Sequence, residues 1–244
     1  MVMMKNLVLV HGFLGGSAQW AAQTAAFSRY FEVVAVDLPG FGLKSGLEAP
    51  ERIGDYADFV LDELAGLGIM HFHLLGHSMG GMIVQEMAAR APERIERLVL
   101  YGTGPIGMMP GRFEPIEESR RRASEDGASA TGRRIAATWF VKGEMAEHYP
   151  VCEELAVKAS LQAILAGLTA MESWSGLSAL PKIAVPTLVL WGDSDRAYLW
   201  DQPEQLWRQI PGAQLAVIPG CSHAVHLEKP HLFNAVLEDF LLSR

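Results

Sequence analysis

The chain has 244 residues, of which 50% are hydrophobic and 20% are charged, and its formal net charge at pH 7 is −8. This composition is ordinary for a compact enzyme with an α/β core, and the acidic balance excludes the basic face that a nucleic-acid-binding protein needs. Cys152 and Cys221 are too few for a disulfide framework and lack zinc-ligand spacing, so we expect a cytoplasmic protein without a metal site.

Short apolar runs alternate with longer amphipathic segments along the chain, which is the pattern of parallel strands joined by helices. The first run, Leu7–Val10, is far shorter than a membrane helix and no signal-peptide cleavage site follows it, so we interpret it as a buried strand. Further strands are expected at Val33–Val36, Phe72–Leu75, Leu98–Tyr101, Thr187–Trp191 and Leu215–Ile218. Helices are expected at Ile53–Leu67, Met79–Arg90, Pro203–Gln209 and Leu232–Leu242. The predicted fold class is therefore α/β, with a doubly wound and mostly parallel sheet.

The alternation stops between about Gly104 and Lys182, where only helical patterns occur. These patterns cover Ser119–Ser124, Gly132–Val141 and Glu153–Leu168. We therefore expect residues 1–103 and 183–244 to form the core of the protein. Residues 104–182 are expected to form a helical cap that is inserted between two strands of the sheet.

A candidate nucleophile lies in the segment Gly76-His-Ser78-Met-Gly80, which fits the pattern G-x-S-x-G. Glycine on either side of the serine removes the Cβ atoms that would clash in a tight strand-to-helix turn, and the turn exposes the hydroxyl group. The pattern is short enough to occur by chance, and a structural serine in a glycine-rich turn is the alternative. Its position between an expected strand and an expected helix favours Ser78 as a nucleophile.

The loop His11-Gly-Phe13-Leu-Gly-Gly16 follows the first expected strand and is the candidate source of an oxyanion hole. Its glycines allow the backbone to approach a ligand closely. The backbone N–H groups of Phe13 and Met79 are the expected donors to a developing oxyanion. A plain turn is the alternative interpretation of this loop.

The last two expected strands are followed by acidic and histidine-containing loops, in the order Ser, Asp, His along the chain. Both loops lie at carboxyl ends of strands, where open parallel sheets place their sites. We expect His223 to be the general base and Asp195 to orient it, because the chain must leave the sheet before a carboxylate can turn towards the next loop. Asp193 and His226 are the alternatives, as a turn cap and as part of a supporting turn.

The segments HGFLGG, DLPGFG, GHSMGG, WGDSD and GCSHAVHLEKP resemble the α/β-hydrolase family in order and spacing over nearly the whole chain. The resemblance selects Asp195 as the acid, implies a cap after the strand that ends near Tyr101, and leads us to expect that the family's first hairpin is missing. HGFLGG is similar to the menaquinone-pathway synthase group, which tends to carry Arg where this chain has Met82. Meta-cleavage carbon–carbon bond hydrolases tend to carry Trp where this chain has Ala224. Small-ester and enol-lactone hydrolases are the relatives that these residues contradict least.

The expected reaction is acyl transfer on a small ester, lactone or activated carbonyl compound, through an acyl-enzyme and with neither a metal nor an organic cofactor. The alternatives are a carbon–carbon bond hydrolase or cofactor-free lyase on the same scaffold, and a ligand-binding receptor with little turnover. A small molecule is the expected partner, with no nucleic acid and no membrane, and the protein is expected to be a monomer or a homodimer.

Substrate selection is expected to depend on the cap, which is rich in large apolar side chains. The substrate-binding candidates are Met108, Trp139, Met145 and Trp174, and further apolar candidates are Met109, Phe140 and Met171. Packing of cap helices against one another is the alternative role for these side chains. Two arginine clusters, Arg120–Arg122 and Arg133–Arg134, form either a carboxylate-binding site or, as we favour, a solvated helix face.

Overall fold

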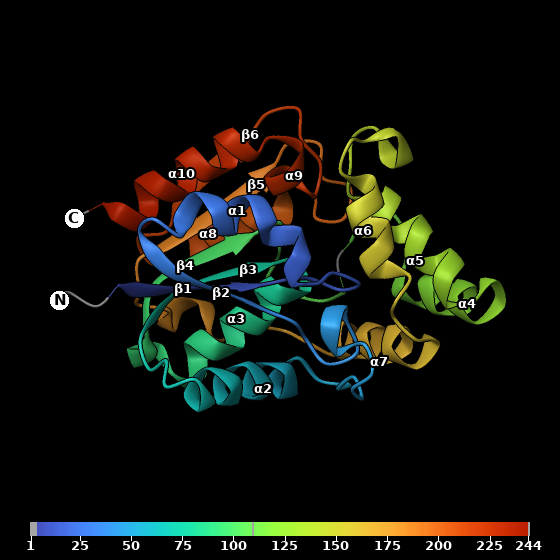
Figure 1. Cartoon of the computed structure of the whole chain (residues 1–244), viewed down its shortest axis with the longest axis horizontal. Helices are drawn as coiled ribbons and strands as arrows, with labels where there is room; N and C mark the ends of the chain where they lie inside the picture. The colour runs from blue at the N-terminus through green and yellow to red at the C-terminus, as the bar shows by residue number, and fades with distance from the viewer. Residues whose placement is uncertain (1–3, 109, 244) are drawn as a thin grey trace.

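A computed structural model describes residues 4–108 and 110–243, and these residues build one six-stranded sheet with helices on both faces (Figure 1). Every pair of neighbouring strands is parallel, and the strand order is β2-β1-β3-β4-β5-β6. The strands are β1 (Lys5–Val10), β2 (Phe31–Val36), β3 (Phe72–His77), β4 (Ile95–Tyr101), β5 (Thr187–Gly192) and β6 (Gln214–Ile218). The predicted doubly wound parallel sheet is thereby confirmed. Its order reverses between β1 and β3, which is where open α/β sheets form a crevice at the carboxyl ends of their strands.

Alternate side chains of each strand enter different apolar clusters, because successive Cβ atoms of a strand point to opposite faces. In β1, Val8 and Val10 belong to one cluster, and Leu7 and Leu9 belong to the other. The first cluster is completed by α2 (Ile53–Gly66), α3 (Met79–Arg90) and α8 (Asp201–Gln209). The second is covered by α1 (Ala21–Phe27) and α10 (Pro230–Leu242), preceded by the short α9 (Val225–Glu228). Burial on both faces explains why these strands are continuous apolar runs in the sequence.

Between β4 and β5 the chain forms four helices, which we call the helical insertion. They are α4 (Ile116–Asp126), α5 (Ala128–Ala137), α6 (Tyr149–Ala156) and α7 (Leu161–Glu172). Figure 1 shows the helical insertion at the side of the sheet that is opposite to both chain termini. Its entry and exit run side by side, because Gly107 donates to the carbonyl of Trp174 (3.0 Å) and Gly176 donates to that of Pro105 (2.8 Å). The insertion therefore leaves and rejoins the sheet through one paired stem.

The helices differ from the sequence prediction in several places, including α9, which was expected only as a supporting turn. The expected helix Glu153–Leu168 is divided into α6 and α7. The division lies at Ser160, whose Oγ accepts a hydrogen bond from the N–H of Ala163 (3.1 Å) and caps α7. Apolar residues on both sides of the break keep a helical spacing, so periodicity alone did not reveal it. Helix α1 was not predicted, and it has no side-chain cap that could have marked its start.

Within residues 4–108 and 110–243, none of the helices combines the length and the apolar character that crossing a bilayer requires.

Candidate active site

Ser78 lies on the turn between β3 and α3 in a strained backbone conformation. Its φ is 58° and its ψ is −121°, a region that costs a non-glycine residue ~1–3 kcal/mol. The N–H of Ser78 donates to the carbonyl of Tyr101 (3.0 Å), and its own carbonyl accepts from Gly81 (2.8 Å) and from Thr103 Oγ1 (2.8 Å). These bonds to α3 and to the end of β4 hold the serine in the strained turn.

Glycines allow three backbone segments to meet around this turn. A Cβ atom on Gly76 would lie 2.3 Å from the carbonyl oxygen of Gly80, and one on Gly80 would lie 2.4 Å from that of Val10. A Cβ atom on Gly12 would lie 2.8 Å from the Cβ of Ser78. A larger residue at Gly12 or Gly80 would push the end of β1 and its loop away from the serine turn, and one at Gly76 would push α3 away from β3.

The loop after β1 begins with His11, which is fully buried and fixes the loop to the end of β2. Its Nε2 accepts from the N–H of Leu38 (3.0 Å), so Nδ1 carries the proton and donates to the carbonyl of Gly12 (2.8 Å). Burial lowers the pKa of His11 to about 4, and the ring is therefore neutral at pH 7.

Phe13 and Met79 bring two backbone donors to the side of Ser78. Neither N–H has an acceptor among residues 4–108 and 110–243. Met79 begins α3. The N–H groups in the first turn of a helix lack intrahelical acceptors and form the positive end of the helix dipole. The pair of N–H groups is thus available to an oxygen that gains negative charge next to Ser78.

His223 and Asp195 are in direct contact although they follow different strands. Nδ1 of His223 lies 2.8 Å from Oδ2 of Asp195, and both side chains are buried. The other carboxylate oxygen, Oδ1, accepts from the N–H groups of Ala197 (2.7 Å) and Tyr198 (3.1 Å). A carboxylate offers only acceptors, so it holds the proton of the imidazole on Nδ1 and leaves Nε2 as an acceptor.

The structure does not bring the alternative residues, Asp193 and His226, into this pair. Oδ1 of Asp193 accepts from the N–H of Gly220 (2.7 Å) and joins the turns that follow β5 and β6. Nδ1 of His226 lies 3.0 Å from the hydroxyl of Tyr101, behind the histidine loop. Burial lowers the pKa of His226 to about 3, so this imidazole is a neutral packing group.

Ser78 and His223 line the same narrow cavity, which has a volume of about 30 Å³. This is about the room that one or two water molecules need, so only a small acyl group fits without movement of side chains. Other residues that line the cavity come from the loops after β1 and β5 and from the stretch between β4 and β5. They are Phe13, Arg112, Phe113, Ile135, Trp139, Met171, Ala197 and Tyr198.

Of the four substrate-binding candidates, only Trp139 is among the residues that line this cavity. Met108 is 64% exposed and borders a neighbouring hollow, and Met145 is 85% exposed. Trp174 is buried, but its Nε1 donates to Glu86 on α3 (2.9 Å). The structure therefore brings Trp139 to the candidate nucleophile and leaves the other three away from it.

The three further apolar candidates differ in the same way. Met171 lines the cavity, Phe140 lies outside it, and Met109 falls outside the described residues. Sequence analysis missed Tyr198, whose ring stacks on the imidazole of His223 with centroids 5.5 Å apart and planes 11° apart. Burial raises the pKa of Tyr198 to about 12, against the opposing effect of the nearby Ser78 side chain. No sequence signal marks this tyrosine apart from its place three residues after the acid.

The two arginine clusters of the helical insertion are engaged in ion pairs, and their residues are not among those that line the cavity. Each guanidinium is neutralised by a glutamate of the same segment. The pairs are Arg120–Glu172 (2.6 Å), Arg121–Glu118 (2.7 Å), Arg122–Glu118 (2.8 Å), Arg133–Glu153 (2.8 Å) and Arg134–Glu114 (2.7 Å). The solvated helix face agrees with these contacts better than a carboxylate-binding site does.

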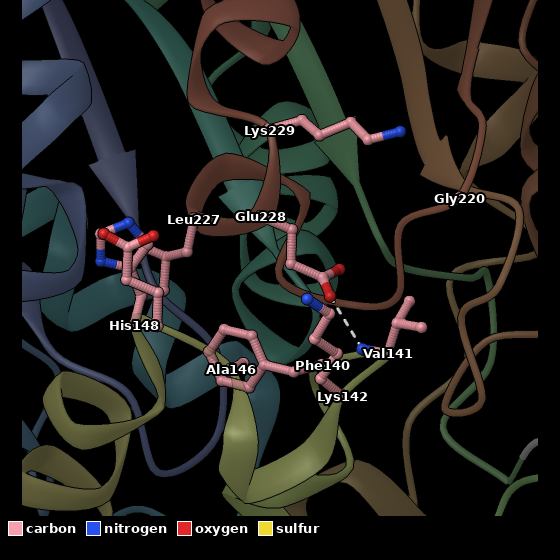
Figure 2. A pocket seen from close by; sticks show the side chains of 10 residues that line it. Phe140, Val141, Lys142, Ala146, His148, Gly220, Leu227, Glu228 and Lys229 are labelled. Carbon is pink, nitrogen blue, oxygen red and sulfur yellow. Dashed lines mark hydrogen bonds between the residues drawn. The ribbon is translucent and has the colours of Figure 1, made fainter.

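A separate hollow of about 260 Å³ lies where the helical insertion meets the histidine loop (Figure 2). None of the three candidate catalytic side chains lines it. Glu228 lies at its border, with Oε1 accepting from the N–H of Val141 (2.7 Å) and Oε2 from the N–H of Ser222 (2.6 Å). One carboxylate thus connects the insertion to the residue that precedes His223.

Other nucleophiles and metal ligands offer no competing site in the part of the chain that the structure describes. No three His, Cys, Asp or Glu side chains are grouped there as metal ligands. Cys152 and Cys221 are buried, and burial raises the pKa of the first thiol to about 12 and of the second to about 11. Neutral buried thiols are poor nucleophiles, so Ser78 remains the candidate.

Comparisons with known proteins show the family and the fold of the chain. The family model described as "Alpha/beta hydrolase family" matches residues 7–236. The carboxylesterase YbfK of Bacillus subtilis is 28% identical, over 97% of this chain and 80% of its own. A 2-hydroxy-6-oxononadienedioate/2-hydroxy-6-oxononatrienedioate hydrolase of Paraburkholderia phymatum is 30% identical, over 97% of this chain and 87% of its own.

Among solved structures, the enol-lactonase of Burkholderia xenovorans LB400 superposes with a TM-score of 0.90 at 26% identity. The superposition covers 99% of this chain and 92% of the lactonase. The similarity therefore includes the helical insertion as well as the sheet.

Proposed function

Because the chain belongs to the alpha/beta hydrolase family, we propose that it is a serine hydrolase that cleaves a small ester or lactone. The main support is the cavity that Ser78 and His223 line together, with Asp195 in contact with the far side of the imidazole at 2.8 Å. Relatives named as a carboxylesterase and an enol-lactonase support the same class of substrate.

In the acylation step of this proposal, Oγ of Ser78 attacks the carbonyl carbon of the substrate. Nε2 of His223 accepts the hydroxyl proton, and Asp195 stabilises the imidazolium through the proton on Nδ1. The carbonyl oxygen becomes an oxyanion and accepts hydrogen bonds from the N–H groups of Phe13 and Met79. The imidazolium then protonates the departing alkoxide, the bond between the carbonyl carbon and this oxygen breaks, and an acyl-enzyme remains.

Deacylation repeats the sequence with water in place of the serine hydroxyl. His223 accepts a proton from water as the water oxygen attacks the acyl carbon. Collapse of the second tetrahedral intermediate breaks the bond to Ser78 Oγ, which takes the proton back from the imidazolium. The products are an alcohol and a carboxylic acid, or one hydroxy acid or oxo acid when the substrate is a lactone.

A second candidate is hydrolysis of a carbon–carbon bond beside a carbonyl group. It is supported by the 30% identical relative from Paraburkholderia phymatum, which is named for such a substrate. The same side chains would serve, but the leaving group would be a carbanion that needs protonation on carbon. A vinylogous 1,5-diketone tests this reaction directly.

Labelling with a fluorophosphonate, together with a screen of p-nitrophenyl esters, lactones and vinylogous 1,5-diketones, tests the proposal. We expect rapid labelling of Ser78, no labelling of the Ser78→Ala variant, and turnover of short esters or lactones. An unlabelled wild-type protein that turns over none of these compounds would contradict the serine-hydrolase proposal. Labelling with turnover of the diketones alone would favour the second candidate.

A further inference from the structure

Arg112 is the cationic side chain among the residues that line the cavity with Ser78 and His223. It lies in the connection between β4 and α4. Nη1 of its guanidinium donates to the carbonyl of Glu114 (2.7 Å) and to Ser119 Oγ (3.3 Å). Both partners are uncharged acceptors. No carboxylate among residues 4–108 and 110–243 forms an ion pair with Arg112.

The carboxylate of Glu114, whose charge acts on Arg112, is bound to other groups. Its Oε2 pairs with Arg134 (2.7 Å) and with Arg122 (3.4 Å), and its Oε1 accepts from Ser119 Oγ. The carboxylate of Asp195 is likewise occupied, by the imidazole and by two backbone N–H groups. Arg112 therefore brings a positive charge to the cavity that no acidic residue neutralises directly.

The position of Arg112 is fixed relative to the catalytic residues. The N–H of Phe113 donates to the carbonyl of Arg196 (3.1 Å), so the segment that carries Arg112 is bound to the loop that carries Asp195. Arg112 and Tyr198 are close enough to influence each other: the guanidinium lowers the pKa of the phenol, against the larger effect of burial. Burial also lowers the pKa of Arg112 itself. A guanidinium that has lost water without gaining a carboxylate attracts an anionic ligand.

We propose that Arg112 binds a carboxylate group of the substrate, so that the enzyme prefers small esters or lactones that carry a free carboxylate. This inference rests on the serine-hydrolase function proposed above, and it names the substrate class. Nε and Nη2 of the planar guanidinium have no acceptor within residues 4–108 and 110–243 and can donate two parallel hydrogen bonds to one carboxylate. The small cavity favours a short chain between that carboxylate and the reacting carbonyl.

Two pairs of matched esters test the proposal. The first is monoethyl glutarate and its neutral amide, in which a carboxamide replaces the carboxylate on the acyl chain. The second is 4-acetoxybutyrate and its amide, with the charge on the alcohol part. We expect the wild-type protein to prefer the charged ester, in kcat/KM, by about 10-fold or more in at least one pair, because charge-assisted hydrogen bonds are the stronger ones.

The Arg112→Met variant keeps the length of the side chain and removes its charge. We expect the charged-to-neutral ratio of kcat/KM to fall by about 10- to 100-fold in that pair, and Arg112→Lys to retain part of the preference because it keeps the charge without the fork. Arg121→Met is the matched control, because Arg121 pairs with Glu118 and Glu125 on the surface of α4, and its ratio should equal that of the wild type.

A ratio that stays the same in Arg112→Met, for both pairs, would overturn the inference. The inference would also be overturned if the wild-type protein cleaved the ester bond of both carboxamide compounds at least as well as that of the charged esters. This second result does not depend on the folding of any variant. Turnover of neutral esters without dependence on Arg112 would leave the serine-hydrolase proposal intact. Absence of turnover on all four esters, with an unlabelled Ser78, would instead contradict the proposed function itself.

Discussion

The two walls of the cavity are built in different ways. On the sheet side, Ser78, Asp195 and His223 follow strand ends and are positioned by backbone hydrogen bonds and by glycines that tolerate no Cβ atom. On the other side, Arg112 and Trp139 come from the stretch between β4 and β5 and contribute their side chains to the cavity. The glycines on the sheet side cannot be replaced without moving the backbone, whereas Arg112 and Trp139 can each be exchanged for a smaller side chain. The proposed chemistry and the proposed substrate selection should therefore be separable by mutation.

The largest expected effect is on the sheet side, at the nucleophile. Ser78→Ala should lower kcat/KM on any ester by ~10⁴- to 10⁶-fold, because the hydroxyl that attacks the carbonyl is gone. The melting temperature should change little, since the half-buried hydroxyl adds no packing to the core. Ester hydrolysis and thermal unfolding, measured on one preparation, check both statements. Residual activity above about a tenth of the wild-type value would place the chemistry elsewhere.

The next effect distinguishes two carboxylates on the same loop. Asp195→Asn would present a carboxamide to Nδ1 of His223 and should lower turnover by ~10⁴-fold, since the imidazole loses its preferred tautomer and its counter-charge. Asp193→Asn removes the charge but keeps an oxygen that can accept from the N–H of Gly220 and from Ser194 Oγ, so it should cost about one order of magnitude or less. Both variants are to be assayed on one ester under identical conditions. A dead Asp193→Asn enzyme beside an active Asp195→Asn enzyme would reverse the assignment.

A third effect concerns the stability of the sheet side in acid. His11 is neutral in the folded protein down to about pH 4, whereas the unfolded chain takes up a proton near pH 6.5. Between these values the unfolded state binds more protons, so the free energy of unfolding should decrease as the pH falls, by ~3 kcal/mol for this group.

Urea unfolding at several pH values between 8 and 4.5 measures this dependence. His11→Gln should make the slope smaller, because a glutamine does not titrate, and the part that comes from other buried histidines such as His226 should remain. A wild-type stability that rises as the pH falls through this range would contradict the buried neutral imidazole.

The smallest effect is expected on the side of the helical insertion. Trp139→Ala should widen the cavity and raise the preference for longer acyl chains by about 10-fold, with little change on the shortest ester. Met145→Ala is the matched control, because its side chain is 85% exposed and lies outside the cavity. The ranking of p-nitrophenyl acetate, butyrate and hexanoate gives the comparison. Equal losses on all three esters, with a lower melting temperature, would assign Trp139 to packing alone.

The same contrast explains what could be predicted from the sequence. The sheet followed from apolar runs, because strands that are buried on both faces have few alternatives. Ser78, Asp195 and His223 could be predicted as candidates because each has a fixed offset from the end of a strand. Arg112 has no such offset: its place depends on the bond between Phe113 and Arg196, two residues that no local pattern links. Charge clustering raised only Arg120–Arg122 and Arg133–Arg134 as an alternative carboxylate site, and glutamates within the insertion neutralise these charges.

The carboxylate of Glu228 has a mechanical consequence. It binds the N–H groups of Val141 and Ser222 at once, and the N–H of Ala224 donates to the carbonyl of Trp139 (2.8 Å). The connection between α5 and α6 is therefore anchored on both sides of His223. A displacement of the insertion that lifted this connection would therefore also move the loop of His223 and separate the proposed base from Ser78.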